Sequence, residues 1–192
     1  QDTDIMVTFA TGSVATMACN WVATVRKAGV NEVVIGALDQ EMMDACEKAN
    51  VPCVKIEGGA VSKALSQRSA ANVRSDPALY PKMSVLKVGF YRELLSYGFN
   101  VWACDADAVL VGDPRPLMRS PEWADADVAA ATDCIDIPLD SKRPLLHCDL
   151  NTGLVFMRST PKVLAFVLRW RETIASAKEL RIRDQAAFNM LI

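Results

Sequence analysis

Two aspartates one residue apart interrupt an apolar stretch of this chain. Asp105 and Asp107 lie within residues 101–111, whose other members are apolar. A carboxylate at the edge of an apolar sheet is costly to desolvate unless something pairs with it. Side chains two residues apart on a strand share a face, so both carboxylates should project from the strand's carboxyl end, where open α/β sheets bind ligands. Two hard oxygen ligands suit Mg²⁺ or Mn²⁺, which can hold a diphosphate. The plain alternative is a polar strand end followed by a turn.

Two more polar segments follow in the second half of the chain. Asn151-Thr152-Gly153 precedes a strand-like run at 154–157, and Asp184-Gln185 opens a helical pattern. Polar groups at strand ends can converge over a parallel sheet, and helix N-termini favour anionic ligands. Each segment alone has a structural explanation, as turn chemistry or as a helix cap. Together with the paired aspartates, in this order, they predict one site for an anionic ligand.

Alternating strand and helix patterns must position these side chains. Apolar residues recur at helical spacing from Val14 to Val25, and Gly29 ends that helix. Residues 33–35 are all apolar, as in a sheet covered on both faces. The order predicts an α/β fold, with a mostly parallel sheet, right-handed crossovers and helices on both faces. Strands are expected at 5–10, 32–38, 53–56, from 101, 128–131 and 154–157, and helices at 14–25, after 39, at 82–97, at 161–177 and from 184.

Length, charge and hydropathy limit the class of protein. The 192 residues suit one domain that can bury a substantial core, and we expect a single domain over 1–192. The net charge of −2 argues against a dedicated nucleic-acid-binding protein. No apolar run approaches the ~20 residues that span a bilayer, and no signal peptide precedes the first strand. We therefore expect membrane contact only through an anchor that is absent from this chain.

The six cysteines do not form the pairs typical of zinc sites, because none is arranged as Cys-x-x-Cys. Cys134 and Cys148 flank a loop rich in Asp and Pro, and they could be bridged if the compartment is oxidising. Cys19, Cys46 and Cys104 fall on apolar helix or strand faces, where a buried thiol is the usual case.

Several segments of the second half match one family pattern. They are Lys87, Leu94-Leu95-Ser96-Tyr97-Gly98, residues 101–110, Asp113-Pro114, residues 150–160, Trp170 and Asp184-Gln185-Ala186-Ala187-Phe188-Asn189. Through them the sequence resembles the nucleotide-diphospho-sugar transferases of the GT-A fold. The most similar group is the plant and algal family of retaining arabinosyl-, xylosyl- and galactosyltransferases (glycosyltransferase family seventy-seven). The resemblance is specific from about Met83 onward, and before that it rests mainly on strand–helix order and on Val7-Thr8-Phe9-Ala10.

The resemblance implies a donor site built around the paired aspartates. In such enzymes the first aspartate, here Asp105, faces the ribose or the sugar. The second, here Asp107, binds a divalent ion, Mn²⁺ or Mg²⁺, that bridges the diphosphate. Both carboxylates are thus expected at the metal, and Asp105 and Lys87 among the residues that bind the donor. Loss of the sugar leaves charge on the diphosphate, which the ion stabilises as a Lewis acid.

The same resemblance assigns residues to the rest of the donor. Thr8 and Ala10, in and after the first strand, would lie near the uridine. Asn151, Asp184 and Gln185 would lie near the sugar and are the expected catalytic residues, with Asp184 positioning the sugar or stabilising charge. Retaining members show no obvious nucleophile, and none is assigned.

The activity implied is metal-dependent transfer of a sugar from a UDP-sugar to a glycan or glycoprotein acceptor, with retention, in the Golgi lumen. Members usually complete the metal site with a histidine beyond the Asp-Gln helix. The only histidine here is His147, upstream of Asn151, and the chain ends at Ile192. We expect His147 to be a loop or surface residue, and the domain to lack a C-terminal segment.

Two other functions fit parts of the sequence. The run 105–109 also fits the motif of haloacid-dehalogenase-type phosphatases, with Asp105 as nucleophile, Asp107 as acid–base group and bound Mg²⁺. Three strands precede the motif here, although it normally follows the first strand, and the two later segments stay unexplained. The other function is a non-catalytic scaffold of this fold in a larger assembly. Sugar transfer, phosphate release or neither would distinguish the three.

Overall fold

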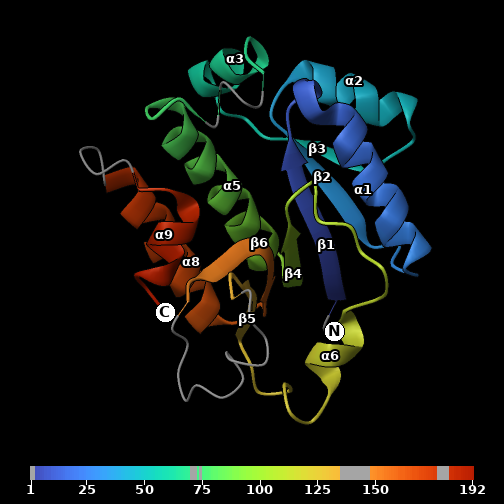
Figure 1. Cartoon of the computed structure of the whole chain (residues 1–192), viewed down its shortest axis with the longest axis vertical. Coiled ribbons are helices and arrows are strands. Elements are labelled where there is room, and N and C mark those ends of the chain that lie inside the picture. The colour runs from blue at the N-terminus through green and yellow to red at the C-terminus, as the bar shows by residue number, and fades with distance from the viewer. Residues whose placement is uncertain (1–2, 70–72, 74, 135–147, 177–181) are drawn as a thin grey trace.

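A six-stranded sheet forms the centre of the molecule (Figure 1). The computed structural model describes residues 3–69, 73, 75–134, 148–176 and 182–192. The strands are β1 (Thr3–Ala10), β2 (Val33–Ala37), β3 (Cys53–Lys55), β4 (Phe99–Cys104), β5 (Val128–Thr132) and β6 (Leu150–Met157). Their order is β3-β2-β1-β4-β6-β5. The first four in this order pair in parallel, and β6 is antiparallel to both of its neighbours, so the predicted mostly parallel sheet is confirmed.

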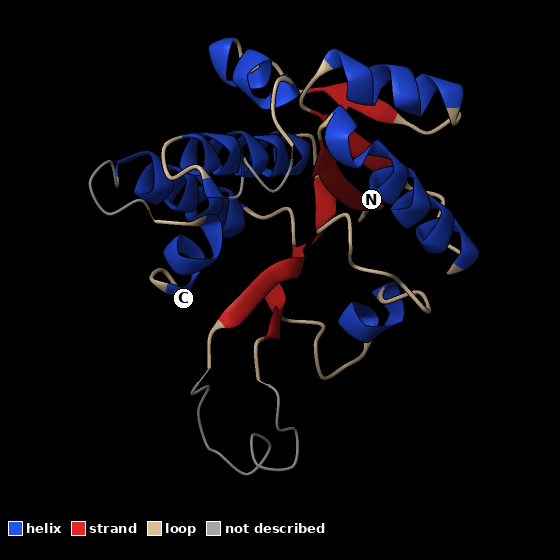
Figure 2. Ribbon diagram, turned by 45° about the horizontal axis from the view of Figure 1, so that its top comes forward, coloured by secondary structure: helices blue, strands red, loops and turns tan. Residues whose placement is uncertain are grey.

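Helices cover both faces of this sheet, as predicted. They are the 3₁₀ turn η1 (Gly12–Val14), α1 (Ala15–Lys27), α2 (Gln40–Lys48), α3 (Ala60–Ser66), α5 (Leu79–Ser96), α6 (Arg115–Arg119), α8 (Pro161–Ser176) and α9 (Asp184–Asn189). Figures 1 and 2 show α1 and α2 on one side of the sheet and α5, α8 and α9 on the other. Within the described residues, no helix has both the length and the apolar character needed to cross a membrane.

Two cores hold the sheet between these helices, because side chains alternate along each strand. On β1, Met6 packs in the core that contains Trp21 of α1, and Val7 packs in the core that contains Trp170 of α8. Burying one large apolar side chain contributes ~1.5–3 kcal/mol. The two cores therefore hold the strand ends, and the polar residues beyond them, in fixed positions.

Asp39 ties the segment after β1 to the start of α2. It caps this helix: its Oδ1 accepts the Met42 N–H at 2.9 Å. The same oxygen accepts the Gly12 N–H at 2.9 Å. A helix cap of this kind stabilises by roughly 1 kcal/mol, and here it also fixes the turn that follows β1.

Strand β4 ends earlier than its apolar sequence predicts. It stops at Cys104, and the next residues turn, with the Ala108 N–H donating to the Asp105 carbonyl at 3.0 Å. The expectation that Asp105 and Asp107 share a strand face is therefore wrong, because neither residue lies in the strand. Pairing of β1 with β4 already ends at Ala103. Both aspartates nevertheless follow the carboxyl end of β4, as predicted.

Strand β6 starts at Leu150, earlier than the predicted 154, and its antiparallel direction brings its start to the end of β4. Its register against β5 shifts: Ala130 pairs with Val155, but Ala131 pairs with Asn151. Within this bulge the Gly153 carbonyl accepts the Asp105 N–H at 2.8 Å. β-Bulges commonly re-aim residues beside functional sites, and this one joins two of the three polar segments.

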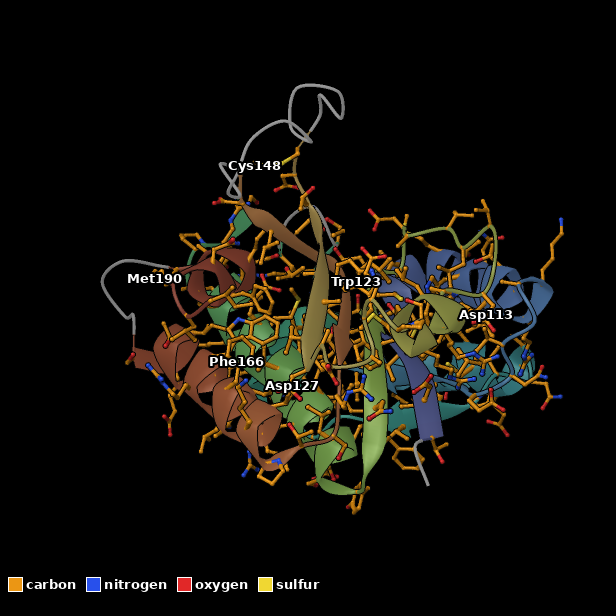
Figure 3. The ribbon with its side chains drawn as sticks, turned by 90° about the horizontal axis from the view of Figure 1, so that it is seen from below. Asp113, Trp123, Asp127, Cys148, Phe166 and Met190 are labelled. Carbon is orange, nitrogen blue, oxygen red and sulfur yellow. A yellow bond between two sulfur atoms is a disulfide. The ribbon has the colours of Figure 1, made fainter. Side chains whose placement is uncertain are left out.

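A disulfide links Cys134 to Cys148, and Figure 3 shows this bond beside the Cys148 label. The Cα atoms are 5.7 Å apart, an ordinary spacing for a disulfide. The bridge that the sequence left open is therefore formed. In the chain-entropy model, closing a loop of ~15 residues contributes about 3 kcal/mol. The enclosed residues 135–147, and with them His147, lie outside the described residues.

Candidate active site

A cavity of about 750 Å³ lies where β1 and β4 end and where β6 and α9 begin. Sites for small molecules generally have volumes of about 300–1,000 Å³. The lining combines an apolar and a charged part. The apolar part comprises Phe9, Val14, Met17, Leu38, Val73 and Met83. The charged part comprises Lys87, Asp105, Asp107, Asp149, Arg183 and Asp184.

Lys87 of α5 joins two of the polar segments by ion pairs. Its Nζ donates to Asp184 Oδ2 at 3.0 Å and to Asp105 Oδ1 at 3.1 Å. The side chains of Lys87 and Asp184 are only 6% and 5% exposed, whereas that of Asp105 is 43% exposed. Charges are buried in proteins when they are paired. Each of the two buried groups is therefore tolerated because of the other, and the pair fixes α9 against α5.

The charge of Lys87 follows from these neighbours. Burial acts to lower its pKa, but electrostatic interactions with Tyr91, Asp184 and Asp105, together with the hydrogen bond to Asp184, outweigh this effect and hold the pKa well above its ordinary value. Burial also raises the pKa of Tyr91, so its phenol is neutral near pH 7. The two carboxylates are thus the partners that act there, and Lys87 is a permanent cation.

Asp184 does not act as a helix cap, which was the structural alternative. It is the first residue of α9, whose N-cap is Arg183, and the Arg183 side chain makes no capping hydrogen bond. Instead its Oδ1 accepts from the Tyr80 hydroxyl at 3.5 Å, while its backbone carbonyl accepts from Trp170 Nε1 at 2.8 Å. These contacts hold the carboxylate against the cavity wall.

The turn at Asp105 packs closely against Gly153 of β6. A Cβ at Gly153 would lie 2.7 Å from Asn151 Oδ1 and 3.1 Å from Asp105 Oδ2, so only glycine fits without displacing them. Asp107 is exposed at the cavity. Among the described side chains it takes part in no ion pair. One carboxylate of the pair is therefore shared with Lys87, and the other is open to a ligand.

Asp133, which the sequence analysis did not single out, holds two of the predicted residues. Its Oδ1 accepts from Asn151 Nδ2 at 2.6 Å, and its Oδ2 accepts from Gln185 Nε2 at 2.7 Å. The position of Asp133 could have been inferred from the two cysteines that flank the loop. If Cys134 and Cys148 are bridged across antiparallel strands, Asp133 is brought opposite residue 149 and close to Asn151.

Seven of the eight predicted site residues line the cavity: Ala10, Lys87, Asp105, Asp107, Asn151, Asp184 and Gln185. Thr8, which the resemblance places near the uridine, is the one of the eight that is not among the lining residues. Its side chain is fully buried, on the face of β1 that carries Met6, because alternation along the strand turns it inward. Phe9 and Thr11 of the same segment line the cavity instead.

The paired aspartates fit a divalent ion that arrives with a diphosphate. No group of three or more His, Cys, Asp or Glu side chains in the described part of the chain could hold a metal by itself. Mg²⁺ sites in proteins often use one or two carboxylates and take their other ligands from water and phosphate. The hard oxygens of Asp105 and Asp107 match that chemistry, whereas a site made of protein ligands alone does not fit.

The sequence matches a known family over most of its length. The family model of the nucleotide-diphospho-sugar transferases covers residues 28–192. The chain belongs to this family. The arabinosyltransferase XEG113 of Arabidopsis thaliana is 25% identical to this chain over 197 residues. That match covers 100% of this chain but 29% of the relative, so the chain spans less than a third of that protein's length.

Solved structures of glycosyltransferases share the fold of this nucleotide-diphospho-sugar transferase. Galactosyltransferase LgtC, solved with donor and acceptor sugar analogues, gives a TM-score of 0.59 at 14% identity over 97% of this chain and 69% of that one. Mouse xyloside xylosyltransferase 1 gives 0.57 at 10% identity, over 98% and 81%. The mannosyltransferase Ktr4p of S. cerevisiae gives 0.61 at 11% identity, over 100% and 65%. Family and fold together overturn the phosphatase alternative.

Proposed function

We propose that this chain forms the donor-binding part of a glycosyltransferase that moves a sugar from a UDP-sugar to a glycan or glycoprotein acceptor, with retention. The names of the similar proteins support an arabinosyl, xylosyl or galactosyl donor. The disulfide supports an oxidising compartment, and we propose the Golgi lumen. Because the chain covers only part of its relatives, the activity is proposed for the full-length protein.

The observation that carries this proposal is the contact of Lys87 with both Asp105 and Asp184. Three polar segments, separated by many residues in the sequence, line one cavity, and this buried lysine ties the first to the last. Buried ion pairs are costly to form and strongly perturb the groups involved. Such pairs in a cleft are candidate functional groups rather than ordinary packing.

In the proposed mechanism the charged part of the cavity receives the diphosphate and the sugar. Asp105 and Asp107 would hold a divalent ion, Mn²⁺ or Mg²⁺, which stabilises negative charge on the leaving diphosphate when bound. Asp184, held in place by its ion pair with Lys87, would face the sugar and stabilise positive charge that develops there. Asn151 and Gln185 would orient the sugar through their amide groups. The apolar part, with Phe9 and its neighbours, would hold the uracil ring.

The proposal is tested by incubating the full-length protein with UDP-galactose, UDP-xylose and UDP-arabinose, each with Mn²⁺ and a panel of glycan acceptors. We expect UDP release and labelled product from at least one donor. Product analysis by NMR should show that the anomeric configuration is retained. Absence of both transfer and donor hydrolysis with every pair would favour the scaffold function instead.

We expect UDP to bind this chain at least about tenfold more tightly with Mn²⁺ than with EDTA, a difference of ~1.4 kcal/mol. The reason is charge: of the described residues, four carboxylates but only two cationic side chains line the cavity, so a diphosphate is repelled unless a cation accompanies it. Isothermal titration calorimetry measures this difference directly. At a hundredfold excess over Kd, the bound pair should also stabilise the fold by about 2.7 kcal/mol. Equal affinities in the two buffers would contradict the metal assignment.

Gly153→Ala should lower the kcat of sugar transfer by about a hundredfold, the scale of loss that displacement by ~1 Å can cause in an active site. The added Cβ must push Asn151 Oδ1 and Asp105 Oδ2 out of their places. Gly112→Ala is the matched control, because a Cβ there meets nothing within 4 Å. Transfer kinetics with circular dichroism check the result, and equal rates for the two variants would refute the close-contact argument.

A further inference from the structure

The Asp133 carboxylate bridges the two amide side chains of the proposed sugar site. It accepts from Asn151 Nδ2 on β6 at 2.6 Å and from Gln185 Nε2 on α9 at 2.7 Å. An ionised carboxylate has no proton to donate, so both amides must turn their NH₂ ends toward it. Hydrogen bonds to a charged acceptor are roughly twice as strong as neutral ones. The carboxylate therefore selects one orientation for each amide.

Backbone donors fix the other end of both amides. Asn151 Oδ1 accepts the Gly153 N–H at 2.6 Å, and Gln185 Oε1 accepts the Thr152 N–H at 3.4 Å. If either amide were flipped, its oxygen would face the Asp133 carboxylate and its NH₂ group would face a backbone N–H, so neither hydrogen bond could form. Each amide keeps a second N–H that these bonds do not use, and both residues line the cavity. The orientation that Asp133 imposes thus decides which amide hydrogens remain for a ligand.

The backbone beneath Asp133 is cross-linked by the disulfide. Its N–H donates to the Asp149 carbonyl at 2.9 Å, and the next pair along the hairpin is Cys134 and Cys148. Asp133 itself is exposed, so water competes for its carboxylate, and keeping an unanchored strand end ordered would carry an entropic cost. Together these contacts extend the β5–β6 pairing past the end of the sheet and hold the carboxylate in reach of both amides.

We propose that Asp133 is a positioning residue for sugar transfer and that the Cys134–Cys148 disulfide keeps it in place. This inference rests on the proposed function, since it concerns Asn151 and Gln185 at the sugar. Loss of Asp133 should affect the two ends of the cavity differently. Loss of Asp133 should disturb the sugar end, where both amides lie, and leave the apolar wall and the Asp107 carboxylate unchanged. The expected signature is a lower kcat with nearly constant affinity for UDP.

The test compares full-length variants. Asp133→Ala removes both hydrogen bonds and should lower kcat by about a hundredfold, with UDP affinity within about twofold. Asp133→Asn can present its oxygen to only one of the two amides and should give an intermediate kcat. The Cys134→Ala/Cys148→Ala double variant should also lower kcat without weakening UDP. Asp127→Ala is the matched control, because Asp127 lies at the opposite end of the β5–β6 hairpin from Cys148 (Figure 3) and its ion pair is with the exposed Lys162.

A second measurement detects the hydrogen bonds of Asp133 to Asn151 and Gln185 without any catalytic turnover. In ¹H–¹⁵N spectra of the protein, the side-chain NH₂ signals of Asn151 and Gln185 should both move in Asp133→Ala, and neither should move in Asp127→Ala. These signals test the bridge even if the wild-type enzyme transfers no sugar, in which case only the proposed function fails. Unchanged NH₂ signals and kcat in Asp133→Ala would overturn the inference. So would a UDP affinity that falls in parallel with kcat, because that pattern indicates general damage.

Discussion

Asp107→Asn should lower sugar transfer by at least about a hundredfold in the full-length enzyme, which corresponds to ~2.7 kcal/mol in the activation free energy. Asparagine keeps the shape of the side chain but removes the charge that would hold the divalent ion. The fold should persist, because Asp107 is exposed and forms no ion pair among the described side chains. Removing one of two neighbouring carboxylates also relieves their repulsion. Initial rates with labelled donor, with circular dichroism as the folding check, measure both effects.

The control for this prediction is Asp125→Asn, which removes an equally exposed carboxylate in the turn before β5, outside the cavity. Its rate should equal that of the wild type. Raising Mn²⁺ should partly restore Asp107→Asn, because a weakened ion site can be filled by mass action. A folded Asp107→Asn enzyme with the wild-type rate would remove the metal assignment and favour the scaffold function.

The sequence predicts the arrangement of the first half because its signals are local. Runs such as residues 33–35 are apolar throughout, and only a strand covered on both faces tolerates this. With strands and helices alternating, the right-handed crossover leaves few arrangements for β1, β2 and β3. The carboxyl ends of these strands then share one edge, which is why Ala10 and the aspartates after β4 could be expected near each other.

The details at Asp105 could not be predicted, because they depend on partners distant in the sequence. An alternating or apolar pattern shows which face a residue occupies, but not where a strand stops. Strand β4 stops where its pairing with its neighbours stops: β1 pairs with it as far as Ala103, and Gly153 of the β6 bulge then accepts the Asp105 N–H. That bulge arises from a register shift between β5 and β6, so the residues near Asp105 in the sequence do not predict it.

Thr8 and Asp133 also show that the sequence does not determine which side chains reach the site. The family resemblance places Thr8 at the donor, but alternation along β1 turns its side chain into the core. Asp133 was missed because its partners, Asn151 and Gln185, are distant in the sequence. Lys87 was found only through the family resemblance. Its spacing of i+7 from Tyr80 on α5 places both on one helical stripe, yet spacing alone cannot distinguish a buried cation from a surface lysine.

Lys87→Met should destabilise the fold by about 3–5 kcal/mol, the usual cost of removing one partner from a buried ion pair. Methionine fills similar space, so the loss comes mainly from the Asp184 carboxylate, which is 5% exposed at its side chain and would be left buried without its cationic partner. The free energy of unfolding from urea titrations measures this loss. Lys162→Met is the matched control: it removes a lysine that is 85% exposed at its side chain, and surface pairs of this kind contribute at most about 1 kcal/mol.

The double variant Lys87→Met/Asp184→Asn separates stability from function. It removes both buried charges, so most of the lost stability should return, since a neutral amide needs no cation to be buried. Sugar transfer should not return, because the proposed role of Asp184 needs its negative charge. A cycle built from the wild type, both single variants and the double variant gives the coupling energy between the two side chains. A coupling near zero would show that the ion pair does not hold α9 against α5, and recovered transfer in the double variant would exclude Asp184 from the reaction.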